Sequence, residues 1–180
     1  MPIEVEKKYR LTAEQAESLP RRLEEAGAEG KGAAEFEENT LYAGPGLDPA
    51  RRVLRLRRKG ERAVFTFKER DASGSAVKRQ PEEETEVSDA AALAAILEAL
   101  GYRPALVYEK RRATWRLAGA EVVLDELPFG LFAEIEGEEA NILEAEKLVG
   151  LDGAEAEHDS YPKLTLRHGA KKGDVVEARF

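Results

Sequence analysis

Like-charged residues recur two positions apart along this chain, as in the pairs Glu4 and Glu6, Arg55 and Arg57, and Glu134 and Glu136. Side chains two positions apart on a β-strand lie on the same face, roughly 7 Å from each other. Like charges at that distance repel each other unless a group of opposite charge lies between them. A charged ligand bound on that face of a sheet is the natural counterion.

The basic members of this set could bind a polyanion, because arginine and lysine side chains donate hydrogen bonds to phosphate oxygens. Carboxylates on the same faces would repel that anion unless they hold hard divalent cations such as Mg²⁺ or Mn²⁺, which prefer carboxylate oxygens and bridge to phosphates. The combination indicates phosphoryl-transfer chemistry. The candidate basic residues are Lys8, Arg55, Arg57, Lys68, Lys110 and Arg112, and the candidate acidic residues are Glu4, Glu6, Glu84, Asp125, Glu134 and Glu136.

The segments that carry these residues alternate between apolar and charged side chains, which is the pattern of strands. Hydrophobic residues at helical spacing mark other segments, the first of which begins with a capping box formed by Thr12 and Gln15. Pro20 should kink or split that helix, and the polar residues 71–81 indicate an exposed loop. We expect strands over residues 3–11, 34–42, 53–58, 63–69, 82–87, 105–117, 121–126 and 131–136, and helices over residues 13–26, 89–100 and 138–149.

Short connections between successive strands favour an antiparallel sheet, so we predict an α+β fold with about eight strands and about three main helices. A polar strand face is ordinarily a solvated surface. Here the polar faces are segregated sets of charges, which favours helices on the apolar faces and the charged faces turned inward. The sheet would then close into an eight-stranded antiparallel β-barrel with a charged interior. In the acidic strand, where the register could slip by one residue, we prefer Glu82 and Glu84 inward.

The composition limits the classes of function. The chain has 180 residues, with 28 Lys+Arg against 36 Asp+Glu and a formal net charge of −8, which argues against general nucleic-acid binding because that requires a basic surface. The absence of cysteine excludes thiol catalysis and Cys-ligated metals. No apolar run approaches the ~20 residues of a membrane helix, and the opening Met1-Pro2-Ile3-Glu4 lacks the pattern of a signal peptide. We therefore expect a cytoplasmic protein without membrane or nucleic-acid partners.

The ordered set of charged motifs resembles the CYTH domain, the family of triphosphate tunnel metalloenzymes. The resemblance covers nearly the whole chain, to about Leu164. It implies a tunnel domain over residues 1–166 that binds tripolyphosphate, ATP or thiamine triphosphate with Mg²⁺ or Mn²⁺, and that could form a homodimer. A tail over residues 167–180 would follow, whose Val175 and Val176 could dock as an extra edge. The motifs are Glu4-x-Glu6-x-Lys8, Arg55-x-Arg57, Thr66-Phe67-Lys68, Glu82-x-Glu84, Lys110-x-Arg112, Asp125 and Glu134-x-Glu136.

The resemblance also implies roles for single residues. The six basic residues would hold the phosphates, and Glu84 and Asp125 would support a second metal or its waters. The segment 160–164 resembles the closing segment of the family, a short helix at one tunnel end, in which Lys163 would be a further substrate-binding residue that favours hydrolysis. The expected metal ligands are Glu4, Glu6, Glu134 and Glu136, and the expected catalytic residues are these four with Lys8 and Asp125.

The resemblance leaves the reaction open, because the nucleophile decides it. In hydrolytic members water attacks the terminal phosphorus, whereas in class IV adenylyl cyclases the ribose 3′-hydroxyl of ATP attacks the α-phosphorus and releases pyrophosphate. We predict a metal-dependent triphosphatase. The first alternative is an adenylyl cyclase that makes cyclic AMP, and the second is a noncatalytic module that binds polyphosphate or a nucleotide.

Overall fold

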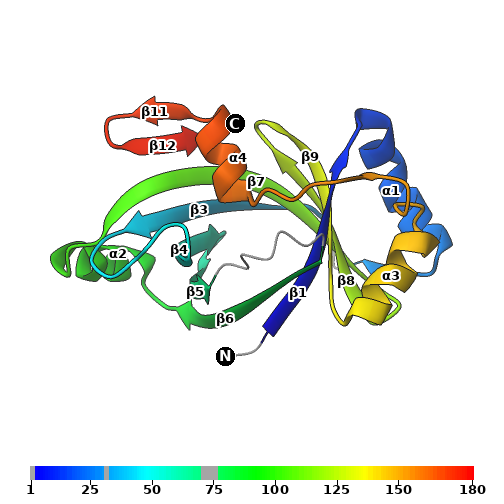
Figure 1. Ribbon diagram of the computed structural model, residues 1–180, viewed down its shortest axis with the longest axis horizontal. Helices are drawn as coiled ribbons and strands as arrows, with labels where there is room; N and C mark the ends of the chain where they lie inside the picture. Colours follow the sequence, from blue (N-terminus) through cyan, green and yellow to red (C-terminus); the bar gives the residue numbers. More distant parts are fainter. Residues whose placement is uncertain (1–2, 31–32, 70–76) are drawn as a thin grey trace.

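The charged strands assemble into one large curved sheet (Figure 1). The computed structural model describes residues 3–30, 33–69 and 77–180, with the backbone alone described for Ile3, Glu4 and residues 77–80. No helix in these ranges is long and apolar enough to cross a membrane. The helices are α1 (Ala13–Glu25), α2 (Ala90–Ala99), α3 (Glu139–Leu148) and α4 (Tyr161–His168). The strands are β1 (Ile3–Leu11), β2 (Glu29–Gly30), β3 (Glu35–Ala43), β4 (Arg52–Lys59), β5 (Arg62–Glu69), β6 (Val77–Val87), β7 (Arg103–Leu117), β8 (Ala120–Leu127), β9 (Gly130–Glu136), β10 (Glu155–Ala156), β11 (Ala170–Lys172) and β12 (Val175–Ala178).

Two long strands, β1 and β7, change partners along their length. Strand β1 pairs with β6 through residues 3–7 and with β9 through residues 6–11. Strand β7 pairs with β3 through residues 103–112 and with β8 through residues 111–117. The sheet therefore splays into two halves at these strands, and a cavity lies between the halves. The full order of neighbouring strands is β11-β12-β7-β3-β4-β5-β6-β1-β9-β8.

The architecture is α+β and mainly antiparallel, as expected, but it is not a closed eight-stranded barrel. The sheet has twelve strands in the described part of the chain. The short strands β2 and β10 pair with β7 and β1, and the C-terminal hairpin adds β11 and β12. Strands β1 and β7 each divide their length between two neighbours, and only residues 111–117 of β7 pair with β8. Besides the three main helices that we expected, a fourth helix, α4, lies where the resemblance implied a short closing helix.

Helices cover the apolar outer faces of the sheet, which turns the charged faces inward. Helices α1 and α3 lie against β1, β8 and β9 (Figure 1), where Leu19 and Ile142 pack with Ile135 in one buried cluster. On the other half of the sheet, Leu97 of α2 packs with Leu56 of β4. Burying such side chains stabilises a fold by about 1.5–3 kcal/mol each. This gain fixes the face that each strand presents to the interior, as the alternation predicted.

Several local expectations are confirmed and others need correction. The capping box of Thr12 and Gln15 is present, with both hydrogen bonds formed. Helix α1 continues from Ala13 to Glu25 through Pro20, so of the two expected effects of this proline the split does not occur. Proline has no backbone N–H to donate, but Leu19 and Leu23 on either side of Pro20 are buried, and such burial stabilises the helix against the sheet. Residues 77–81 belong to β6 instead of a loop, and residues 70–76 lie outside the described part of the chain.

The C-terminal residues dock against the sheet as an added edge. Strand β12 pairs in parallel with residues 106–108 of β7. Arg179 then forms 2.7 Å ion pairs with Glu38 and Glu109, and the Arg111 guanidinium lies 4.0 Å from the centre of the Phe180 ring. The segment that we considered as a tail therefore extends the half of the sheet that contains β3 and β7.

Candidate functional site

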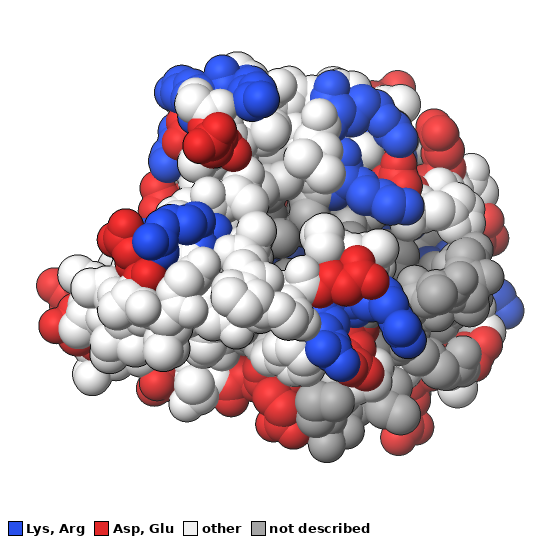
Figure 2. Space-filling model, turned by 60° about the vertical axis from the view of Figure 1, so that its left-hand side comes forward, with Lys and Arg blue, Asp and Glu red and all other residues white. Residues whose placement is uncertain are grey.

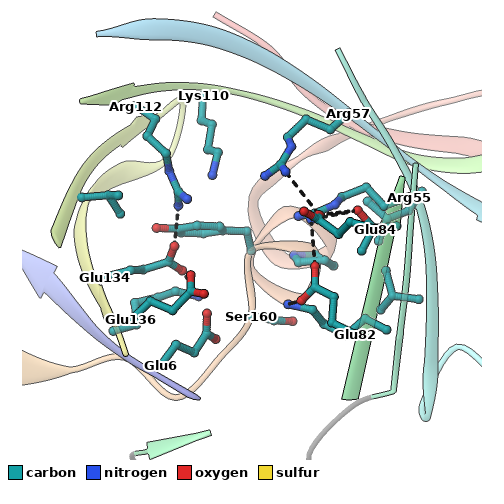
Figure 3. Close-up of a pocket in the computed structure, with 18 of the residues that line it drawn as sticks. Glu6, Arg55, Arg57, Glu82, Glu84, Lys110, Arg112, Glu134, Glu136 and Ser160 are labelled. Atoms are coloured by element: carbon teal, nitrogen blue, oxygen red, sulfur yellow. Dashed lines mark hydrogen bonds and ion pairs between the residues drawn. The ribbon is translucent and has the colours of Figure 1, made fainter. Parts of the chain in front are cut away.

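A cavity of about 630 Å³ lies between the two halves of the sheet. Figure 2 shows basic and acidic side chains side by side around a hollow in one face, and Figure 3 shows charged side chains pointing into the cavity from opposite walls. Among the described residues, six basic and seven acidic side chains line it. The basic residues are Lys8, Arg55, Arg57, Lys68, Lys110 and Arg112, and the acidic residues are Glu6, Glu82, Glu83, Glu84, Glu121, Glu134 and Glu136.

All six basic residues that the sequence pointed to are brought together in this cavity. Lys8 comes from β1, Lys68 from β5, one pair of cations from β4 and another from β7. Lys8 and Lys110 are only 3% and 2% exposed. Buried charges of this kind are costly unless oppositely charged groups accompany them. Lys8 pairs with Glu134 at 3.2 Å, and Lys110 lies 3.4 Å from Glu37 and 3.7 Å from Asp125.

The first wall consists of β4, β5 and β6. One oxygen of Glu84 accepts hydrogen bonds from Arg55 and Arg57 at 3.3 and 3.2 Å, and from the Thr66 hydroxyl at 2.7 Å. Glu82 forms a 2.7 Å ion pair with Lys68. Both glutamates face the cavity, which confirms the orientation that we preferred for the acidic strand.

The second wall consists of β1, β7, β8 and β9. Glu134 forms ion pairs with Lys8, at 3.2 Å, and with Arg112. Burial alone would raise the pKa of the Glu134 carboxyl, but the attraction of Lys8 and Arg112 outweighs it and lowers the pKa. Glu134 is therefore ionised, and it holds two of the cations that we expected to bind phosphate.

Asp125 lies behind this wall instead of lining the cavity. It is completely buried and accepts two hydrogen bonds from Arg112, at 2.7 and 2.5 Å. The hydroxyl of Tyr161, at the start of α4, donates a third at 2.7 Å. We expected Asp125 among the metal ligands and catalytic residues. Its observed contacts are those of a group that holds Arg112 in position.

A row of three glutamates crosses the second wall. Glu6 of β1 stands opposite Glu136 of β9, which stands opposite Glu121 of β8, and all three line the cavity. The sequence pattern had pointed to Glu6 and Glu136 but not to Glu121. Period-two alternation could have predicted that Glu121 faces the interior. It lies four residues before Asp125 on the same strand, so the two side chains are on the same face.

The order and placement of these charges can be compared with known proteins. A family model for the CYTH domain matches residues 2–154 of the chain. The chain belongs to the CYTH family. This result confirms the resemblance read from the charged motifs, and no curated protein gave a significant match.

Solved structures with the same CYTH fold cover most of the chain. The protein PH1012 from Pyrococcus horikoshii is 25% identical, with a TM-score of 0.75, over 89% of this chain and 98% of the other. A candidate adenylate cyclase from Vibrio parahaemolyticus is 24% identical, with a TM-score of 0.70, over 90% of this chain and 97% of the other. HpAC1 from Hippeastrum, a candidate adenylyl cyclase described as having a dominant triphosphatase activity, is 18% identical, with a TM-score of 0.66, over 96% of this chain and 98% of the other.

Lys163 does not join the other cations of this CYTH domain. Its side chain is 63% exposed and forms a 3.4 Å ion pair with Asp159. The neighbouring residues of the short helix, Ser160, Tyr161 and Pro162, do line the cavity. The closing helix is thus placed as expected, but the residue it presents to the interior is Tyr161 instead of Lys163.

Several of the carboxylates expected to bind metal line the cavity, but within the described ranges they are not gathered into a formed metal site. Carboxylate oxygens are the donors that Mg²⁺ and Mn²⁺ prefer, and Glu6 and Glu136 lie side by side on neighbouring strands. Among the described side chains, however, no three His, Asp or Glu groups gather closely enough to hold an ion. The side chain of Glu4 lies outside the described part of the chain. The chemistry of the wall fits a hard divalent cation.

Proposed function

We propose that this CYTH domain binds a triphosphate together with Mg²⁺ or Mn²⁺ and hydrolyses it. The observation that carries the proposal is the lining of the cavity, where six basic side chains stand among seven acidic ones. The basic groups suit the oxygens of a short polyphosphate. The acidic groups would repel such an anion, so their presence in the same cavity supports binding of cations with it.

The residues that would hold the metal are Glu6, Glu134 and Glu136, with Glu4 expected from its motif. A divalent cation bound there would polarise the phosphoryl oxygens and offset their developing charge. Phosphoryl transfer otherwise depends mainly on positioning and electrostatic stabilisation. The chain's own part is to hold the phosphates in one orientation and to limit the access of water from other directions.

Arginine and lysine would have different parts in holding the phosphates. The guanidinium groups of Arg55, Arg57 and Arg112 have a fixed fork of donors that matches phosphate oxygens in pairs. Lys110 is a buried point charge whose pKa is lowered, first by burial and then by the nearby Arg112. A phosphate oxygen beside Lys110 would favour its protonated form. Binding of the anion would thus offset part of the cost of burying the Lys110 charge.

The lining favours hydrolysis over cyclisation. Among the described residues, the aromatic side chains of the cavity are Tyr108 and Tyr161, both buried, and Tyr161 is bound to Asp125. The Lys8 ammonium already lies 3.9 Å from the centre of the Tyr161 ring, so the two buried rings offer little surface on which a purine base could stack. HpAC1, which has the same fold, is described as mainly a triphosphatase. Lys163 gives no support to this choice, because it lies outside the cavity.

A product assay tests the proposal directly. Tripolyphosphate, ATP and thiamine triphosphate are offered with Mg²⁺ and separately with Mn²⁺, and orthophosphate, pyrophosphate and cyclic AMP are resolved in one chromatographic run. We expect orthophosphate from tripolyphosphate or thiamine triphosphate. Cyclic AMP with an equal amount of pyrophosphate would show an adenylyl cyclase instead. Binding of a triphosphate without any product would show a noncatalytic module.

A further inference from the structure

Three hydrogen-bond donors converge on a single oxygen of Glu84. Arg55 Nη2 lies 3.3 Å, Arg57 Nη2 3.2 Å and Thr66 Oγ1 2.7 Å from Glu84 Oε1. Figure 3 shows this carboxylate between the two arginines on the cavity side of the β4–β5 pair. An oxygen anion that receives two guanidinium groups and a hydroxyl has the environment that a phosphate oxygen requires.

The donors are more buried than the carboxylate that they contact. Thr66 is completely buried, and its hydroxyl also accepts a 3.3 Å hydrogen bond from Arg55 Nη2. The side chains of Arg55 and Arg57 are 16% and 20% exposed, while that of Glu84 is 38% exposed. A partly exposed glutamate on one edge of such a site can rotate away at low cost, because partly exposed ion pairs contribute little net free energy.

We propose that Arg55, Arg57 and Thr66 form a binding site for one phosphate group, and that the Glu84 carboxylate occupies this site until a triphosphate displaces it. The inference rests on the proposed function and deepens it in two ways. It adds the Thr66 hydroxyl as a phosphate ligand. It also makes Glu84, which the sequence placed among the metal-supporting residues, an internal anion that competes with the substrate.

The neighbouring glutamate has a different contact pattern. Glu82 forms its close ion pair with Lys68 at 2.7 Å and lies 3.7 Å from Arg55. Glu82 therefore contacts one of the two arginines, whereas Glu84 contacts both. Competition for the three-donor site is therefore specific to Glu84, and substitution of other acids on β6 should not reproduce its effect.

The test is the affinity for inorganic tripolyphosphate, measured by calorimetry in EDTA for the wild type, Glu84→Gln and Glu84→Ala. Removing the competing charge should tighten binding roughly fivefold or more in both variants. Glu86→Gln is the matched control, because Glu86 lies on the same face of β6, is exposed, and is outside the cavity lining. It removes the same charge and should leave the affinity unchanged.

The Thr66→Val variant should change the affinity for tripolyphosphate in the opposite direction. Valine keeps the shape of threonine but lacks the hydroxyl, so tripolyphosphate should bind at least about threefold more weakly, both alone and in the Glu84→Gln background. Unchanged or weaker binding by both Glu84 variants, or equal tightening by Glu86→Gln, would overturn the inference. These outcomes concern binding without metal, so they are separate from failure of the proposed function, which would show as absence of product from the wild type with Mg²⁺ and Mn²⁺.

Discussion

The hydroxyl of Tyr161 donates a 2.7 Å hydrogen bond to Oδ2 of Asp125, and this bond joins the closing helix to the charged interior. Burial and the nearby Asp125 raise the pKa of the Tyr161 hydroxyl, which therefore remains a donor. The same oxygen of Asp125 accepts a hydrogen bond from Arg112, which in turn contacts Glu134. The ring of Tyr161 lies 3.9 Å from the ammonium group of Lys8. Helix α4 thus holds two of the proposed phosphate ligands in place.

Replacing Tyr161 by phenylalanine should therefore lower catalysis without removing the cavity wall. The ring contact with Lys8 would remain, but Asp125 would lose one of its donors, at a cost of about 1–2 kcal/mol in the free energy of unfolding. We expect the turnover rate to fall roughly three- to tenfold because Arg112 is held less firmly. Tyr102→Phe is the control, since the Tyr102 hydroxyl bonds to the backbone of Pro45 away from the cavity. Equal turnover by both variants would exclude a positioning role for Tyr161.

Two neighbouring arginines of β4 provide a matched test of the inward face. Arg57 lines the cavity, whereas Arg58 points to the other face and pairs with Glu38 at 3.1 Å. Arg57→Ala should weaken triphosphate binding at least about tenfold, and Arg58→Ala should not change it. Calorimetry with Mg²⁺ and tripolyphosphate measures both. Similar affinities for the two variants would place Arg57 outside the binding site.

The Glu6→Gln variant should lose activity while keeping its stability. Glu6 stands opposite Glu136 on the neighbouring strand, and both carboxylates line the cavity. Removing one of two adjacent negative charges should be neutral or stabilising in the metal-free protein, by up to about 1 kcal/mol. Activity and thermal unfolding should be measured together. A large fall in the melting temperature would show that Glu6 has a structural role instead of a catalytic one.

Glu37 should make the stability of the protein depend on pH below its ordinary pKa. Burial alone would raise the pKa of this carboxyl, but Lys110 and Arg112 lower it from 4.5 to about 2. The carboxyl is therefore harder to protonate in the folded than in the unfolded chain. Its stabilising effect, about 3 kcal/mol, is complete above pH 4.5 and is lost as the pH falls towards 2.

Urea unfolding at pH 6, 4 and 3 measures this effect of Glu37. The wild type should lose more stability over this range than Glu37→Gln, which lacks the titrating group but should be less stable at pH 6 because Lys110 loses its partner at 3.4 Å. Parallel pH dependences for the two proteins would contradict the account of Glu37.

The alternation of side chains was enough to predict that the six basic residues face the cavity. On β4, period-two alternation separates Arg55 and Arg57 from Leu56, and the buried Leu56 fixes the orientation of all three. For the acidic strand the same rule allowed two registers, of which the preferred one, with Glu82 and Glu84 inward, is observed. This part of the site depends on local geometry and on burial of apolar side chains, both of which can be read from sequence.

Partners within the interior could not be predicted in this way. Asp125 and Tyr161 are 36 positions apart and meet only because α4 returns across the end of the sheet. The hydrogen bonds between Glu84 and the two arginines depend on the register of β5 and β6, in which Thr66 pairs with Glu84. Lys163 was misplaced for a related reason, because the orientation of a short helix is set by its packing, here by the buried Tyr161 and Leu164.

The central claim is that the charged cavity hydrolyses a triphosphate with a divalent cation. The most direct measurement is release of orthophosphate from tripolyphosphate in Mg²⁺, followed side by side for the wild type, Arg57→Ala and Arg58→Ala. The account predicts release by the wild type and by Arg58→Ala, and release at least about tenfold slower by Arg57→Ala at low substrate concentration. Absence of orthophosphate from the wild type, or equal rates for the two variants, would contradict it.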